Sequence, residues 1–245
     1  MNADAALSAP PISSTERLID ALFDEASVSR IGPLVTGTGT LDGQAVAILA
    51  TAERAQIGAD LALAMARNVL DVMREAPARP ILIVVDNSGH RLGRWDELMG
   101  NNGYLAHLST CLYLARRRGH RVIGLVNELA VSAGFMALGM ATDACYAMPE
   151  AEVRVMALNA MSRVTKVPLD RLTELCATSP VLGPGVANFI RVGALRGIWS
   201  GDLSAHLREA LAEMPGERDT RRELGLERGG RTLARDIAAQ VRAGV

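Results

Sequence analysis

The sequence predicts an α/β fold, and two observations lead to this prediction. A stretch with helical periodicity precedes the buried apolar run Ile81–Val85, and a second one precedes the run Val122–Val126. Residues that end a helix stand before each strand, Pro77 and Pro80 in the first case and Gly119 in the second. Two consecutive helix–strand units are typical of α/β proteins.

The residues before these units predict a helix and a β-hairpin. Ser13 and Glu16 match a capping box, and apolar side chains then recur at helical spacing, so a helix is expected to about Ala26. Glycines punctuate residues 32–43, and the strand candidates in this section are Val35, Leu41 and Val46–Leu49.

Helical stripes define most of the remaining elements. Helices are expected over Gly58–Glu75 and Tyr104–Arg118. After the second strand the pattern predicts a helix over Ala133–Ala141, short strands at Cys145–Met148 and Val153–Met156, a helix over Pro168–Cys176, and C-terminal helices within Asp202–Met214 and Arg218–Arg242.

The domain organisation follows from length and punctuation. A length of 245 residues suits one larger domain with a sizeable core. Residues 1–12, with their Ala, Ser and paired Pro, are expected to be a mobile leader. Because no polar linker, repeat or low-complexity tract follows, one domain is expected over residues 13–245.

Composition argues against several function classes. The 26 basic and 27 acidic residues nearly cancel and form no block, which argues against nucleic acid as a partner. The longest apolar stretch, Leu129–Ala141, is too short to span a bilayer, and no secretory signal opens the chain, so the expected location is the cytoplasm. The three cysteines are widely spaced, which fits reduced thiols and neither a disulfide framework nor a metal site.

The candidate functional residues follow the two strands of the helix–strand units. Gly89, His90, Gly93 and Arg94 come after the first strand. After the second strand, Ser132, Ala133, Gly134 and Phe135 enter a helix of small residues. Ligands of α/β sheets gather at the carboxyl ends of strands, and a helix start offers free N–H groups and a partial positive charge. The sequence therefore predicts a site that holds an oxyanion.

Both segments resemble the crotonase superfamily, and in particular its carboxyltransferase branch. That branch has an Asp-x-x-Gly turn with a second Gly, and about forty residues later a Ser-Gly-Gly helix start. Here the turn reads Asp86-Asn87-Ser88-Gly89 with Gly93, and the helix start reads Ser132-Ala133-Gly134. Ala133 departs from the usual glycine, which keeps the backbone amides but narrows the approach to them.

A closer resemblance is to the γ subunit of biotin-independent malonate decarboxylase, from about Ser27 to Val241. Four segments carry it: Ser27–Arg30, Gly134–Gly139, Met161–Thr165 and Leu226–Arg231. The resemblance implies a crotonase-like ββα spiral with C-terminal helices. It also implies a homologous β subunit, an acyl carrier protein subunit and an α subunit that acts as the acyl-carrier transferase. The implied substrate is a malonyl thioester on a phosphopantetheine-type arm derived from dephospho-coenzyme A, carried by the partner, with no cofactor or metal on this chain.

The chemistry implied by this resemblance needs few side chains. Loss of carbon dioxide from a malonyl thioester leaves an enolate, whose oxygen can be held by backbone amides. We assign this catalytic role to Ala133, Gly134 and Phe135. Substrate binding is assigned to Ser132 and to the first turn, with Gly89, His90, Gly93 and Arg94. Water or a side chain of the partner subunit supplies the proton.

Several alternatives stay open at this point. Ser132 could be a nucleophile, although a helix N-cap is the favoured interpretation, and Gly134 could serve close packing alone. His90 could donate a proton. A second enzymatic hypothesis is the carboxyltransferase subunit of a biotin-dependent acyl-coenzyme A carboxylase. A third is a catalytically inert structural partner, which the Ala133 departure keeps open.

Overall fold

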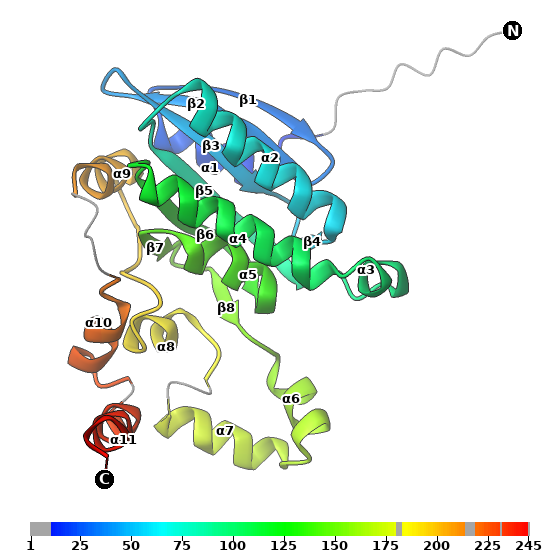
Figure 1. Ribbon diagram of the computed structural model, residues 1–245, viewed down its shortest axis with the longest axis vertical. Helices are drawn as coiled ribbons and strands as arrows, with labels where there is room; N and C mark the ends of the chain where they lie inside the picture. Colours follow the sequence, from blue (N-terminus) through cyan, green and yellow to red (C-terminus); the bar gives the residue numbers. More distant parts are fainter. Residues whose placement is uncertain (1–10, 180–182, 214–218, 231, 245) are drawn as a thin grey trace, which may run out of the picture.

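A computed structural model describes residues 11–179, 183–213, 219–230 and 232–244 (Figure 1). Its strands are β1 (Glu25–Ile31), β2 (Leu34–Leu41), β3 (Gln44–Thr51), β4 (Ala55–Ile57), β5 (Ile81–His90), β6 (Val122–Val131), β7 (Ala144–Ala147) and β8 (Glu152–Arg154). Its helices are α1 (Ser14–Leu22), α2 (Ala59–Glu75), α3 (Arg94–Leu98), α4 (Asn101–Arg117), α5 (Ser132–Leu138), α6 (Leu158–Thr165), α7 (Leu169–Thr178), α8 (Val186–Arg191), α9 (Leu203–Ala212), α10 (Arg221–Glu227) and α11 (Thr232–Ala243). A 3₁₀ turn, η1 (Gly139–Ala141), follows α5.

One mixed sheet organises these elements. Its main order is β1-β2-β3-β5-β6-β7, with β4 paired to β5 and β8 paired to β6. The pairs among β1, β2 and β3 are antiparallel, whereas every pair from β3 onward is parallel. The predicted hairpin is therefore confirmed as β2–β3, and the predicted α/β class is confirmed as well.

Helices cover both faces of the sheet, which creates two hydrophobic clusters. On β5, Ile81 and Ile83 belong to the cluster under α2 and α4, whereas Leu82 and Val84 belong to the cluster with α1 and α9. Figure 1 shows α2 and α4 in front of the sheet and α1 behind it. Burial on both faces explains why this strand is an unbroken apolar run and does not alternate with polar residues.

Several boundaries differ from the predictions. The first helix ends at Leu22, before the expected end at about Ala26. Glu25–Ile31 form β1 instead, and the alternating exposure of this strand is typical of an edge strand. The expected strand at Val153–Met156 is instead β8, which ends at Arg154. The stretch Arg218–Arg242 holds two helices, because the chain turns at Gly229 with a φ of 71°. The helices α3, α6 and α8 were not predicted.

The helices α6, α7, α10 and α11 lie apart from the sheet, whereas α9 packs on it. In Figure 1, α6 and α7 extend below the body and α10 and α11 lie beside them. Arg228 ties the end of α10 to α8 and the loop after it, because it donates hydrogen bonds to the carbonyl oxygens of Ile190, Leu195 and Arg196. Within the described residues, no helix is long and apolar enough to cross a membrane. Residues 1–10 of the expected leader lie outside the described residues, and the one-domain organisation stays a prediction.

Candidate active site

The candidate site lies where β5 and β6 end. The two strands pair in regular parallel register up to Val85 and Val126, but Asn87 then pairs with Ala130. The register thus advances by two residues on β5 and by four residues on β6, so β6 contains a bulge of two extra residues before it reaches α5. A bulge of this kind redirects the chain that follows it. Here it brings the first turn of α5 over the end of β5.

The turn from β6 into α5 is sharp. Val131 is the N-cap in extended conformation, and Ser132 is the first helical residue with a φ of 51°. This left-handed conformation is uncommon for a residue other than glycine. No side chain caps the helix, so the interpretation of Ser132 as an N-cap is wrong. No hydrogen bond joins the Ser132 hydroxyl to a base among the described residues.

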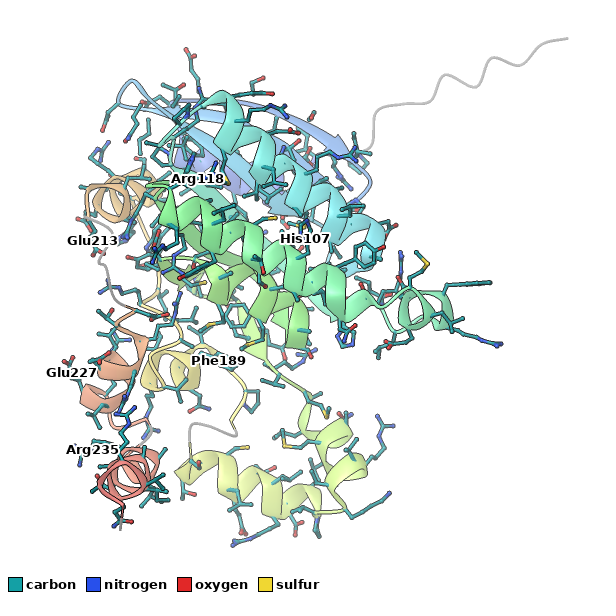
Figure 2. All side chains as sticks on the ribbon, viewed as in Figure 1. His107, Arg118, Phe189, Glu213, Glu227 and Arg235 are labelled. Carbon is teal, nitrogen blue, oxygen red and sulfur yellow. The ribbon has the colours of Figure 1, made fainter. Side chains whose placement is uncertain are left out.

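The first turn of α5 presents backbone N–H groups. The first four N–H groups of a helix have no intrahelical acceptor, and here they belong to Val131, Ser132, Ala133 and Gly134. The N–H of Phe135 comes next and belongs to the helical ladder. The Phe135 side chain is 1% exposed and packs edge-on against Phe189 of α8, which Figure 2 labels, with ring centroids 5.8 Å apart. Phe135 therefore anchors α5 in the core.

Gly134 allows α5 to approach β5 closely. A Cβ atom at this position would lie 2.5 Å from Oδ1 of Asn87 and 3.2 Å from Cδ1 of Ile57. Asn87 is fully buried, and its Oδ1 accepts hydrogen bonds from the N–H of Gly89 at 3.1 Å and of Val131 at 3.5 Å. Asn87 is not among the residues predicted for the site. The feature that could have indicated it is a polar amide close behind the buried apolar run of β5.

The predicted first turn is distributed over two elements. Gly89 and His90 belong to β5, which continues through the expected turn and pairs there with β4. The N–H of Gly89 is engaged by Asn87, so a substrate would have to compete for it. His90 is half-buried, and its buried Nδ1 has no hydrogen-bond partner within the described part of the chain.

Gly93 and Arg94 lie on a different element from Gly89 and His90. Gly93 is the N-cap of α3, and Arg94 is its first residue. In Figure 1, α3 projects from the body beyond the start of α4, apart from α5. Arg91 holds this helix through a two-bond fork to Asp96, with both distances 2.8 Å. The predicted substrate-binding set is thus divided between the end of β5 and a projecting helix.

A shallow apolar groove of about 390 Å³ begins at the first turn of α5. It is lined by residues of α4, α5 and the segment after β8: Leu105, Ala106, Ser109, Ser132, Ala133, Met136, Ala137 and Val155. The open N–H groups of α5 therefore border a surface that suits an extended, mostly apolar ligand.

Ionisable groups near the strand ends serve mainly structural contacts. Asp86 is fully buried, and burial raises the pKa of its carboxyl group, although its Oδ2 accepts a hydrogen bond from the N–H of Arg54. No cluster of three His, Cys, Asp or Glu side chains suited to a metal ion occurs in the part of the chain that the structure describes. Backbone donors without a nucleophile–base pair can stabilise a negative oxygen.

Comparisons with known proteins identify a family and a fold. The model of the family described as malonate decarboxylase gamma subunit (MdcE) matches residues 52–245. A curated relative, the malonyl-S-ACP:biotin-protein carboxyltransferase MADD of Malonomonas rubra, is 28% identical over 179 residues, which are 66% of this chain. The matched region spans only 61% of that relative's length.

Solved structures extend the likeness to almost the whole chain. The Pseudomonas malonate decarboxylase hetero-tetramer in complex with coenzyme A is similar with a TM-score of 0.76 and 28% identity, covering 94% of this chain and 97% of that one. The Pseudomonas MdcD–MdcE hetero-dimer is similar with a TM-score of 0.75 and 26% identity, and the match covers 95% of this chain and 100% of that one. Transcarboxylase 12S is similar with a TM-score of 0.68, and the match covers 85% of this chain and 44% of that one. Because the identity is only 20%, this likeness supports the fold alone. The predicted crotonase-like fold is confirmed.

Proposed function

The chain belongs to the malonate decarboxylase gamma subunit family, and from this membership we propose that it acts with a homologous β subunit on a malonyl thioester. The thioester is carried by an acyl carrier protein, and the products are carbon dioxide and the acetyl thioester. The observation in the site that carries the proposal is the open first turn of α5, where Ser132 and Ala133 line the groove and buried Gly134 follows them.

The reaction needs these N–H donors and an external source of one proton. As the bond to the departing carboxylate breaks, its electron pair forms the enolate double bond, and negative charge moves to the thioester oxygen. N–H donors at the α5 turn stabilise that oxygen, and loss of one such donor typically costs roughly 3 kcal/mol of transition-state stabilisation. The carbanion carbon then takes a proton from water or from a side chain of the partner. Gly89 and His90 line the substrate on the β5 side in this proposal.

The groove beside Ser132 and Ala133 suits the arm that carries the thioester. A phosphopantetheine-type arm derived from dephospho-coenzyme A is long, narrow and partly apolar, and the groove is open along α4 and α5. Such an arm belongs to the carrier protein as substrate, so this chain binds it only during turnover. An α subunit that loads the carrier completes the proposed assembly.

Unpartnered helix faces support the β subunit as a partner. No residue of α6 is buried, and Val164 on this helix is 70% exposed. On α11, Leu233, Ile237 and Val241 form an apolar stripe with exposures of 79%, 61% and 73%. Contiguous apolar stripes of this kind are uncommon on monomers and mark contact surfaces. We assign both helices to the contact with the β subunit.

A second candidate function comes from the curated relative. Its name describes transfer of a carboxyl group from a malonyl carrier protein to a biotin protein. The same enolate and the same N–H donors would serve that reaction, but the carboxyl group would pass to biotin instead of leaving as carbon dioxide. An inert structural role is the third candidate, in which the α5 turn contributes nothing.

The deciding experiment measures carbon dioxide release from a malonyl carrier protein by this chain in complex with its β subunit. Gly134→Pro removes one N–H donor, whereas Gly134→Ala adds the same Cβ atom against Asn87 and keeps the donor. We expect Gly134→Pro to reduce kcat roughly a hundredfold relative to Gly134→Ala. Circular dichroism and gel filtration establish that both variants fold and assemble.

Each other outcome selects a different function. Equal rates for the two variants would move the chemistry to the partner subunit. Carboxyl transfer to a biotin protein would favour the second candidate, provided that no carbon dioxide is released when the biotin protein is absent.

A further inference from the structure

Asn87 joins three separate parts of the candidate site. It stands in β5 opposite Ala130 at the bulge of β6, and its side chain is fully buried. Its Oδ1 accepts hydrogen bonds from Gly89 in its own strand and from Val131, the N-cap of α5. One carboxamide oxygen therefore fixes both the end of β5 and the residue before the sharp turn.

The space around this carboxamide is closed. Gly134 lies so near that a Cβ atom there would meet Oδ1 at 2.5 Å and Cγ at 3.0 Å. The Nδ2 atom of Asn87 is buried and has no hydrogen-bond partner among the residues that the structure describes. A buried donor without a partner is unfavourable, and an apolar residue of similar size would avoid this cost. The favourable contacts of this side chain are those that its Oδ1 accepts from Gly89 and Val131, which points to the acceptor as the feature that matters.

The residue that follows Val131 needs such support. Ser132 has a φ of 51°, and a non-glycine residue in this region is held there only by its surroundings. Its conformation sets the direction of its own N–H and of the N–H groups of Ala133 and Gly134. If Val131 lost its acceptor, the turn could relax and these donors would change direction.

We propose that Asn87 is a positioning residue, whose Oδ1 holds the β6–α5 turn so that the first-turn N–H groups face the substrate. This inference rests on the proposed function for its effect on rate. Its structural part, the restraint of the α5 turn, is independent of the reaction.

The test compares two substitutions in the complex with the β subunit. Asn87→Ala removes the acceptor, whereas Asn87→Asp keeps an oxygen that can accept from Gly89 and Val131. Asn127→Ala is the matched control, because Asn127 on β6 also makes two hydrogen bonds, to the hydroxyls of Ser14 and Thr15 in α1. Hydrogen–deuterium exchange of peptides covering residues 129–138 reports on the turn, and kcat and KM report on the reaction.

We expect Asn87→Ala to speed amide exchange at the start of α5 at least about tenfold and to lower kcat about tenfold to a hundredfold, with KM changed less than threefold. We expect Asn87→Asp and Asn127→Ala to leave exchange in this peptide within about twofold of wild type.

Two results would overturn the proposal. One is an Asn87→Ala variant whose amide exchange at the start of α5 and whose kcat both equal those of the wild type. The other is faster exchange in Asn87→Asp, which remains informative if Asn87→Ala does not fold. A wild-type complex that releases no carbon dioxide, but shows the expected exchange differences, would contradict the proposed function and leave the positioning role of Asn87 intact.

Discussion

Arg116 and Asp143 form an ion pair that joins the end of α4 to the start of β7. The Arg116 Nε–Asp143 Oδ1 distance is 2.6 Å, and the two side chains are 20% and 8% exposed. The other carboxylate oxygen of Asp143 accepts a hydrogen bond from the N–H of Val122 at 2.8 Å. A single carboxylate thus links α4 to the beginnings of two adjacent strands, at the opposite end of the strands from the candidate site.

Removal of this carboxylate is expected to destabilise the fold. Asp143→Ala leaves the Arg116 guanidinium without its carboxylate partner, although Nη1 still donates to the carbonyl oxygen of Ala141, and leaves the Val122 N–H without its Asp143 acceptor. We therefore expect a loss of about 3 kcal/mol in the free energy of unfolding. Urea denaturation of the isolated chain measures it. Asp71→Ala is the control, because its ion pair with Arg74 is exposed and should contribute less than about 1 kcal/mol. Equal losses in the two variants would contradict this account.

The Arg91–Asp96 fork predicts a pH dependence of stability. The hydrogen bonds from Arg91 hold the pKa of Asp96 below its ordinary value of 3.8. A carboxyl group whose pKa is lowered in the folded state stabilises it fully above the ordinary pKa, and this contribution disappears as the pH falls through the lowered value. We expect the urea midpoint of the wild type to drop more steeply than that of Asp96→Asn below pH 3.8. Parallel curves would show that the fork contributes nothing.

Cys145 is expected to be unreactive in the folded chain. Its thiol is buried, and burial raises its pKa to about 12. At pH 8 almost none of it is therefore the reactive thiolate. Iodoacetamide labelling followed by mass spectrometry should modify Cys145 only when urea unfolds the protein. Full modification of the native chain within minutes would contradict the buried position.

The apolar stripe of α11 is expected to bind the β subunit. Ile237→Asp places a charge in the middle of that stripe, so we expect at least about tenfold weaker association with the β subunit. The unfolding free energy of the isolated chain should change by less than about 0.5 kcal/mol, because the side chain is exposed there. Ala239→Asp, an exposed position on another face of α11, is the matched control. Sedimentation velocity of the mixed subunits measures the association, and equal behaviour of the two variants would exclude the stripe.

Local chemistry made part of the fold predictable. The capping box at Ser13 and Glu16 depends on residues three apart, and both of its hydrogen bonds are present, at 3.2 and 2.8 Å. The apolar runs of β5 and β6 were also evident, because burial on both faces leaves no polar positions. By contrast, β4 has only three residues and forms through its pairing with β5, which a local pattern does not reveal.

The same distinction applies to the candidate site. The order strand, small residues, helix predicted where the N–H donors of Ala133 and Gly134 would lie. Glycine at position 89 predicted a turn, but the chain continues as a strand there because β4 supplies a neighbour. The role of Asn87 depends on how closely α5 approaches β5, and that distance is set by the bulge in β6. The pairing of β4 with β5 and the approach of α5 to β5 both join residues far apart in the sequence, so neighbouring residues alone do not predict them.

The mixed direction of the strands has a consequence for the order of folding. The antiparallel strands β1, β2 and β3 are joined by the two-residue turns 32–33 and 42–43, so their pairing closes very short loops. The parallel pairs β3–β5 and β5–β6 need α2 and α4 to cross over first, which costs more loop-closure entropy. The meander also leaves the ribosome before any of its parallel neighbours. It can therefore serve as the template on which β5, then β6 and the turn into α5 are assembled during synthesis.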